Sequence, residues 1–477
     1  MAALEFFKNK TVSIVLIMAT IAVTMVAVYY VVGRGMEMVF WGIAVVFMFL
    51  LCFFSVKLSL FVIIFSMLLS PEIGAGATAT RAITLRAEDI LLLVMTIAWL
   101  FRMAIFKNLG LIRKNTLNAP IIAYSGLILL STILGSVFGT TEPLSGLFFC
   151  LKLIEYFFLF YVVVNYIHDE SEIHQLLTTM LIVCGIVCVY GIFQAISGGD
   201  VAAPFEGSRG ERNTLGGYLV LMGAVAAGII LYTESTLERI LLSVMLIMAI
   251  TVMLFSISRS SWLGTIVATL VLFFTTKRRR SYFLMVLVLL GVFPFVVPEV
   301  VRDRLLFTFF QQATPGEQVA VGSVMLDTST SARLFSYQLV LQKFMNHPIF
   351  GYGVTGFGFL DGQYFRNLIE IGIVGSLSFF WLLMRVHKVI KNAIRSGGDP
   401  GRLHGMLVGF YAGFWGLLAH ALSANTFIIV RIAEPFWCLM GLCVVYVEFY
   451  KEKGLSVLIP AGVSRGTKKE IAMRTIS

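Results

Sequence analysis

Five arginines are set in polar segments between long apolar runs, and their side chains suit the binding of a phosphorylated ligand. They are Arg209, Arg212, Arg259, Arg333 and Arg366. A guanidinium group keeps its charge and binds phosphate oxygens through two parallel hydrogen bonds. An arginine at the centre of a bilayer costs about 2.5–3.5 kcal/mol on insertion scales, so several of them near one membrane face indicate an anionic ligand such as a diphosphate lipid. The alternative for each one is an anchor that reaches the lipid headgroups.

Two further side chains near Arg366 could act on a hydroxyl substrate. Asp361 is a candidate for proton transfer, and Tyr364 is a candidate for hydrogen bonding to the hydroxyl. The alternatives are a solvated loop carboxylate and an aromatic ring at the membrane surface. Glu370 follows Arg366 by four residues, so the two could pair on one helix face, or Glu370 could brace a catalytic arginine.

The sequence Gly351–Gly356 matches the G-x-G-x-x-G pattern of dinucleotide-binding proteins, but its surroundings do not. That fingerprint requires a preceding strand and a βαβ unit, and the sequence predicts neither. We therefore expect a glycine turn that lets the chain pass close to a bulky ligand.

The composition places these residues in a membrane protein. Hydrophobic residues make up 58% of the chain, charged residues 13%, and the mean hydropathy is +0.92, whereas soluble domains carry about 25% charged residues. The net charge of +10 is then explained by topology and by attraction to anionic lipid headgroups, not by nucleic acid. The sequence holds no Cys/His cluster with the spacing of metal ligands, and we expect neither a metal nor a cofactor.

The apolar runs have the length of membrane spans. A spanning helix needs about 20 mostly apolar residues, and about fourteen such stretches follow one another along the chain. The third stretch is short, so the second and third could form a tilted or re-entrant pair, which would leave about twelve spans. We predict an all-α polytopic protein with spans near residues 12–32, 39–55, 57–70, 88–106, 119–138, 147–167, 175–196, 213–232, 239–257, 260–276, 281–298, 366–386, 405–424 and 431–449.

Basic residues predict the orientation, because Lys and Arg next to spans are retained on the cytoplasmic side. The run Lys277–Arg280 precedes the span 281–298, so the long polar segment after that span is expected outside the cytoplasm. Both termini are predicted to be cytoplasmic. The expected divisions are transmembrane helices 1 to 11 (residues 1–298), one large extracytoplasmic loop (299–365), transmembrane helices 12 to 14 (366–450) and a basic cytoplasmic tail (451–477).

The long loop is expected to contain an amphipathic helix on the outer surface. Thr328–Ser331 could cap a helix that starts near Arg333. Apolar residues recur along one face, and Pro348 ends the helix because the residue before a proline resists helical geometry. The expected apolar face consists of Leu334, Tyr337, Leu341 and Phe344.

These motifs, in their order and spacing, resemble the family of O-antigen ligases and Wzy-type polysaccharide polymerases. Over residues 200–390 the resemblance is carried by Asn213–Leu219, Ser258–Trp262, Arg333, His347–Gly353 and Glu370–Gly375. The rest of the chain is similar in topology alone. The resemblance implies a multi-pass enzyme of the bacterial inner membrane that transfers a glycan without a metal at the periplasmic face.

The resemblance also implies substrates and roles. The donor would be an oligosaccharide on undecaprenyl diphosphate, and the acceptor would be a sugar hydroxyl. Arg259 and Arg333 would hold the diphosphate and stabilise charge on the leaving group. The expected catalytic residues are Asp361, Arg259, Arg333 and Tyr364, and the expected substrate-binding residues are Arg209, Arg212, Arg366 and Glu370.

One departure from the family pattern bears on the reaction. Family ligases have a histidine nine residues before the glutamate, where this chain has Asp361, ordinarily a weaker base than histidine. We therefore favour a polymerase of O-antigen or exopolysaccharide repeats over a ligase that acts on lipid A core, and the identity of the base stays open. A chain-length regulator and other polysaccharide-assembly proteins are the expected partners.

Two other functions compete with an enzyme. A flippase for lipid-linked oligosaccharides also needs many spans and cations, but it should spread charge along a central cavity and show two related halves. The gathering of arginine and one long loop on one face favours an enzyme. A purely structural scaffold would leave the outer arginines unexplained.

Overall fold

The structure is a computed structural model, and it describes residues 46–70, 72–77, 82–106, 113–205, 211–296, 320–321, 324–325, 328–358, 360–395 and 401–458. Some predicted features lie outside these residues: the span near 12–32, residues 39–45 of the span near 39–55, Arg209, residues 299–319 of the expected loop, and most of the tail 451–477.

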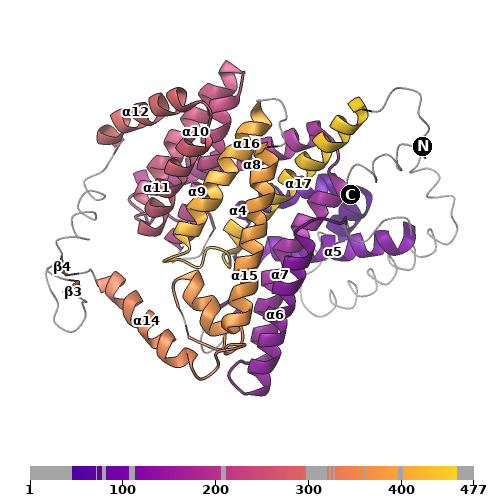
Figure 1. The fold of residues 1–477 in the computed structure, drawn as a ribbon, viewed down its shortest axis with the longest axis vertical. Coiled ribbons are helices and arrows are strands. Elements are labelled where there is room, and N and C mark those ends of the chain that lie inside the picture. Colours follow the sequence, from indigo (N-terminus) through magenta and orange to yellow (C-terminus); the bar gives the residue numbers. More distant parts are fainter. Residues whose placement is uncertain are drawn as a thin grey trace, which may run out of the picture.

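Helices make up nearly all of the described chain, so the predicted all-α polytopic class is confirmed (Figure 1). Two short hairpins, which we did not predict, pair β1 (Glu72–Ala77) with β2 (Ala82–Arg86) and β3 (Ala320–Val321) with β4 (Val324–Met325). The helices are α4 (Val56–Leu69), α5 (Ala87–Phe106), α6 (Asn118–Val137), α7 (Pro143–Tyr166), α8 (Glu170–Ile196), α9 (Arg212–Tyr232), α10 (Thr236–Phe255), α11 (Arg259–Thr275), α12 (Arg279–Val296), α14 (Thr328–Phe344), α15 (Gln363–Arg395), α16 (Arg402–His420) and α17 (Val430–Leu458).

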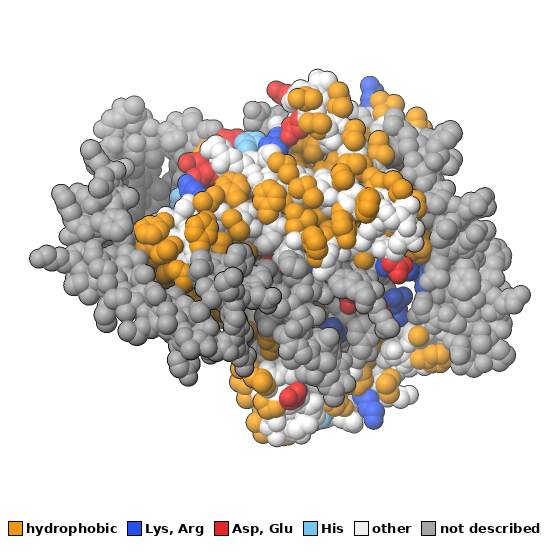
Figure 2. Space-filling view, turned by 180° about the vertical axis from the view of Figure 1, so that it is seen from behind, with side chains coloured by type: hydrophobic (Ala, Val, Ile, Leu, Met, Phe, Trp, Pro, Cys, Tyr) orange, Lys and Arg blue, Asp and Glu red, His pale blue; other side chains and the backbone are white. Residues whose placement is uncertain are grey.

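The lengths and surfaces of these helices suit a bilayer. Seven of the described helices are long and apolar enough to cross a membrane, namely α6, α7, α8, α9, α10, α15 and α17. Each predicted span from residue 57 onward starts within a few residues of an observed helix. Figure 2 shows hydrophobic side chains gathered in a broad area across the middle of one face, where they suit contact with lipid. The chain is a multi-pass membrane protein.

Helix α9 is the centre of the bundle, and it packs against α10, α11 and α16. Glycines make the closest of these approaches. A Cβ at Gly228 would lie 2.3 Å from the Gly405 carbonyl oxygen, and a Cβ at Gly264 would lie 2.8 Å from the Gly416 carbonyl oxygen. Small residues let membrane helices approach closely. These glycines therefore set the distances among α9, α11 and α16, and with them the positions of the helix ends.

Helix α15 is interrupted at Gly372, whose φ of 65° and ψ of −169° are not helical. The predicted span near 366–386 therefore consists of two helical segments that meet at Gly372. The segment before α15 replaces the lost helical hydrogen bonds. The Tyr352 amide donates to the Ile369 carbonyl at 2.9 Å, and the Gly353 amide donates to the Glu370 carbonyl at 2.8 Å. On the other side of the break, the Ile373 amide donates to the Pro348 carbonyl at 2.9 Å.

Helix α14 is the predicted loop helix, and it packs on α15 (Figure 1). It begins at Thr328, earlier than predicted, because the residues expected to cap it form its first turn. Its buried face consists of Tyr337, Val340 and Phe344. Leu341 was wrongly assigned to this face and is 53% exposed. Val340 is buried in place of Leu341, because it packs against Leu360 and Ile369.

Candidate functional site

An ion pair joins the loop helix to the start of α15. Nη2 of Arg333, in α14, lies 3.4 Å from Oδ2 of Asp361, two residues before α15. The two side chains are 24% and 28% exposed, so both can reach a ligand at the surface of the bundle. The structure therefore brings together two of the predicted catalytic residues.

Tyr337, one turn after Arg333, holds α14 in this position. Its ring stacks on Phe365 with centroids 4.1 Å apart, and its hydroxyl donates to the Leu422 carbonyl at 3.0 Å. Burial raises the pKa of Tyr337, so the hydroxyl stays protonated and continues to donate. Gly362 permits the close fit: its φ is +102°, and a Cβ there would lie 2.6 Å from the Tyr337 hydroxyl oxygen.

The starts of α9 and α11 form a second cationic region. Ser258, the N-cap of α11, donates its hydroxyl to Oδ1 of Asn213 at 2.7 Å. Arg212 and Arg259 are the first residues of their helices, and each adjoins one partner of this bond. Arg212 also forms an ion pair with Asp200. Because a helix start carries partial positive charge, both helices add to the charge of the two arginines.

The segment 421–429, between α16 and α17, joins the two cationic regions. The hydroxyl oxygens of Ser260 and Ser423 are 2.7 Å apart, and Ser260 directly follows Arg259. The carbonyl of Leu422, the residue before Ser423, accepts the hydrogen bond from Tyr337 of α14. Arg259 and the Arg333–Asp361 pair therefore border the same short segment.

The predicted pair of Arg366 and Glu370 is confirmed, and it is buried. Nε of Arg366 lies 3.2 Å from Oε2 of Glu370, and the side chains are 6% and 5% exposed. Oε1 of Glu370 accepts from the Thr355 amide at 3.3 Å. This pair therefore braces the glycine turn, whereas the Arg333–Asp361 pair faces outward.

The turn Gly351–Gly356 passes close to other parts of the chain. A Cβ at Gly351, whose φ is +72°, would lie 2.6 Å from the Glu370 carbonyl oxygen. The hydroxyls of residues 140–141, just after α6, donate to the Tyr352 carbonyl at 2.6 and 2.8 Å. The glycines thus seat the loop against α6 and the break in α15.

Tyr364 joins α15 to α16. Its hydroxyl donates to the Leu418 carbonyl at 2.8 Å, and its ring stacks on Phe380 with centroids 5.8 Å apart. While this bond holds, the Tyr364 oxygen can accept a hydrogen bond from a substrate hydroxyl but cannot donate one to it. The structure therefore places Tyr364 in packing and does not bring it to the Arg333–Asp361 pair by any described hydrogen bond.

The sequence analysis missed several polar side chains of this region. They are Asp200, Asn213, Ser260 and Ser423. Asn213 and Ser260 lie within motifs that carry the resemblance, but within Ser258–Trp262 we assigned a role to Arg259 alone. The signal for Ser423 was available, because the polar run Ser423–Thr426 separates two apolar spans.

This arrangement suits chemistry on a phosphorylated lipid at the membrane surface. The guanidinium groups and helix starts supply positive charge for phosphate oxygens. The Asp361 carboxylate, beside one of those guanidinium groups, can accept a proton from a hydroxyl brought to the same place.

Comparison with known families points to the same region. Residues 243–380 match the family model described as O-antigen ligase, and this segment includes Arg259, the Arg333–Asp361 pair and the glycine turn. Among curated proteins, no relative matches the chain. Over residues 243–380, the resemblance of this chain to the family of O-antigen ligases and Wzy-type polymerases is thereby confirmed.

Proposed function

We propose that this protein transfers a glycan from undecaprenyl diphosphate to a sugar hydroxyl during the assembly of O-antigen or exopolysaccharide. The family match at residues 243–380 supports a role in polysaccharide assembly. The observation that carries the proposed reaction is the outward-facing Arg333–Asp361 pair, which sets a phosphate-binding cation beside a proton acceptor.

In the proposed reaction, the acceptor hydroxyl attacks the anomeric carbon of the donor sugar. The proton of the hydroxyl passes to Asp361, and the bond from the anomeric carbon to the diphosphate oxygen breaks. The diphosphate leaves with the electron pair, and Arg333 and Arg259 stabilise the charge that develops on it. Arg212 and the start of α9 bind the phosphate that lies further from the sugar.

Within this class we favour a polymerase that joins lipid-linked repeat units. The support is Asp361, which stands where family ligases have a histidine. The second candidate is a ligase that passes the finished glycan to lipid A core, and the description of the matched family favours it. A polymerase would work with a chain-length regulator and other polysaccharide-assembly proteins.

We place the reaction at the periplasmic face of the bacterial inner membrane, with both termini in the cytoplasm. The support is the run Lys277–Arg280 at the start of α12, since such runs are retained on the cytoplasmic side. Residues 299–365 would then form an extracytoplasmic domain between spans, followed by the spans of 366–450 and the basic tail of 451–477.

The test is to remove each cation in turn. Arg333→Ala and Arg259→Ala should each lower the rate of glycan transfer by about 100-fold or more, the usual effect of losing one donor that stabilises a leaving oxyanion. Arg280→Ala is the control, since it removes an exposed arginine in the first turn of α12, beyond the end of α11 that lies opposite to Arg259. Normal polysaccharide from either site variant, at wild-type protein levels, would remove these arginines from the reaction.

The same strains separate the two candidate reactions. When a polymerase fails, single repeat units accumulate and long chains are missing. When a ligase fails, long chains form but remain on the carrier lipid. Gel analysis of lipopolysaccharide and of the extracted carrier lipid distinguishes these outcomes. Long polymer on the carrier in the Arg333→Ala strain would replace our polymerase proposal with the ligase.

A further inference from the structure

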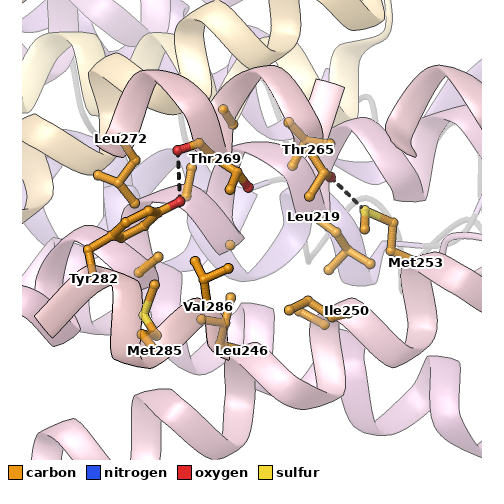
Figure 3. Close-up of a pocket in the computed structure, with 16 residues that line it drawn as sticks. Leu219, Leu246, Ile250, Met253, Thr265, Thr269, Leu272, Tyr282, Met285 and Val286 are labelled. Carbon is orange, nitrogen blue, oxygen red and sulfur yellow. Dashed lines mark hydrogen bonds between the residues drawn. The ribbon is translucent and has the colours of Figure 1, made fainter. Parts of the chain in front are cut away.

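An apolar cavity of about 230 Å³ lies among α9, α10, α11 and α12. Figure 3 shows Leu246, Ile250 and Val286 lining it. Two hydroxyls on its wall are already bonded: that of Tyr282 donates to the Thr269 carbonyl at 2.7 Å, and that of Thr265 lies 2.9 Å from the sulfur of Met253 in α10. The cavity therefore offers hydrocarbon surface to an occupant.

A second cavity of about 460 Å³ adjoins the first and carries cations. The two cavities share Leu246 and Met285 in their walls, so they lie side by side. The second cavity is also lined by Arg239 of α10 and by Arg278, just before α12. Together the two cavities form a groove with a cationic mouth and an apolar interior.

Both arginines are held at the end of α9. Nη2 of Arg239 donates to the Thr233 carbonyl at 2.6 Å, and Nη1 of Arg278 donates to the Leu231 carbonyl at 2.9 Å. A guanidinium group has five N–H donors, so these bonds orient each group and leave donors for a ligand. Both side chains are exposed at the mouth of the groove.

Few acidic groups offset this positive charge. Glu238, the residue before Arg239, pairs with Arg402 at 2.6 Å, and Glu234 is exposed in the connection between α9 and α10. On the other side of the mouth, the sequence Lys277–Arg280 adds further positive charge. The mouth therefore attracts an anion.

We infer that this groove binds one anionic phospholipid, with its phosphate between Arg239 and Arg278 and an acyl chain in the apolar cavity. Basic pockets between membrane helices bind anionic headgroups in this way. Ile250, on the cavity wall, lies eleven residues after Arg239 in α10, so the groove runs for about 16 Å at the helical rise. Half of the hydrocarbon core is about 15 Å thick, which is the depth that one acyl chain occupies.

The groove does not suit the diphosphate lipid of the proposed reaction. Its cations lie at the Arg239 end, opposite to the start of α9 with Arg212. The other end is lined by Leu219, Met253 and Thr265, and the described wall of the apolar cavity contains no charged side chain. A diphosphate near Arg259 would therefore have no path of cations into this groove, and the inference stands whether or not the proposed function does.

The experiment measures the lipid that stays bound to the purified full-length protein. Native mass spectrometry of protein in mild detergent, titrated with phosphatidylglycerol or phosphatidylcholine, gives the Kd for each lipid. The double variant Arg239→Gln and Arg278→Gln should raise the Kd for phosphatidylglycerol about thirtyfold, at roughly 1 kcal/mol per arginine. The double variant Arg385→Gln and Lys388→Gln removes the same charge from exposed positions outside the groove and should leave the Kd unchanged.

A second pair of variants tests the acyl chain without touching charge. Gly223→Leu adds a side chain to the cavity wall, where the nearest atom to a Cβ is 3.7 Å away. Its control is Gly185→Leu, where a Cβ would have nothing within 4 Å. The first should lower phosphatidylglycerol binding and the second should not. Equal binding of both lipids to the wild type, equal losses in variants and controls, or recovery of a polyprenyl diphosphate as the bound lipid would each overturn the inference.

Discussion

Asp361 and Arg333 share one ion pair, so a substitution at either residue changes the electrostatics of the other. Asp361→Asn keeps the size of the side chain but removes its capacity to accept a proton. We expect glycan transfer to fall by about 100-fold or more, the usual contribution of a positioned base. The measurement is in vitro transfer from a lipid-linked donor by purified variants.

Two further variants make this comparison specific to proton transfer. Asp361→His supplies the residue that family ligases have at this position and should retain more activity than Asp361→Asn. Tyr364→Phe removes a hydroxyl that bonds to the Leu418 carbonyl and should change stability more than transfer. Full activity of Asp361→Asn would exclude this carboxylate as the base.

The candidate residues could be predicted singly but not as a group. Charged side chains are conspicuous in so apolar a chain, which is why Arg259, Arg333 and Asp361 could be singled out from the sequence. Their arrangement depends on packing between distant segments, such as the contact between Ser260 and Ser423. No pattern within a single stretch of sequence encodes that contact.

At the scale of elements, the glycine turn and the break in α15 form one unit. Gly351→Ala and Gly372→Ala each place a Cβ against backbone, at 2.6 Å and 2.2 Å, and at positive φ. Each should destabilise the protein by about 1–3 kcal/mol, the cost of a strained backbone position. Gly358→Ala is the control, because a Cβ there has nothing within 4 Å.

The measurement is the thermal unfolding of purified protein, followed together with transfer activity. The two strained variants should lower the unfolding temperature and lose activity, since the turn positions the segment that leads to Asp361. A Gly351→Ala protein as stable as Gly358→Ala would show that the turn does not depend on this close approach.

Although α15 and α17 run nine residues past their predicted ends, helix starts could be predicted to within a few residues, because long apolar stretches mark them. The break at Gly372 could not, since it depends on backbone bonds to residues 348–353, which lie outside the helix. Lys152 gives a second example. Glu155 stands three residues after it on the same helix, yet the Nζ of Lys152 lies 2.9 Å from Oδ2 of Asp89, on α5. Spacing along one helix identifies partners on that helix, but it cannot show that a residue on another helix lies closer.

At the scale of the whole molecule, positive charge gathers at two opposite ends. Helix α9 has 21 residues, and Arg212 stands at its start while Arg239 and Arg278 bond near its end. At the helical rise this length is about 31 Å, close to the hydrocarbon core of about 30 Å. One end therefore suits the phosphates of a lipid substrate, and the other suits the headgroups of the opposite leaflet.

Labelling can test which end faces the periplasm. Every cysteine of the chain is buried, so an engineered exposed cysteine should dominate the reaction with a membrane-impermeant maleimide. Leu339→Cys lies on α14, where the leucine is 45% exposed, and Arg280→Cys lies at the other end of the bundle. In intact cells with a permeabilised outer membrane, the first should react and the second should react after lysis alone. The opposite pattern would put the Arg333–Asp361 pair in the cytoplasm, where a reaction on exported lipid-linked glycan cannot occur.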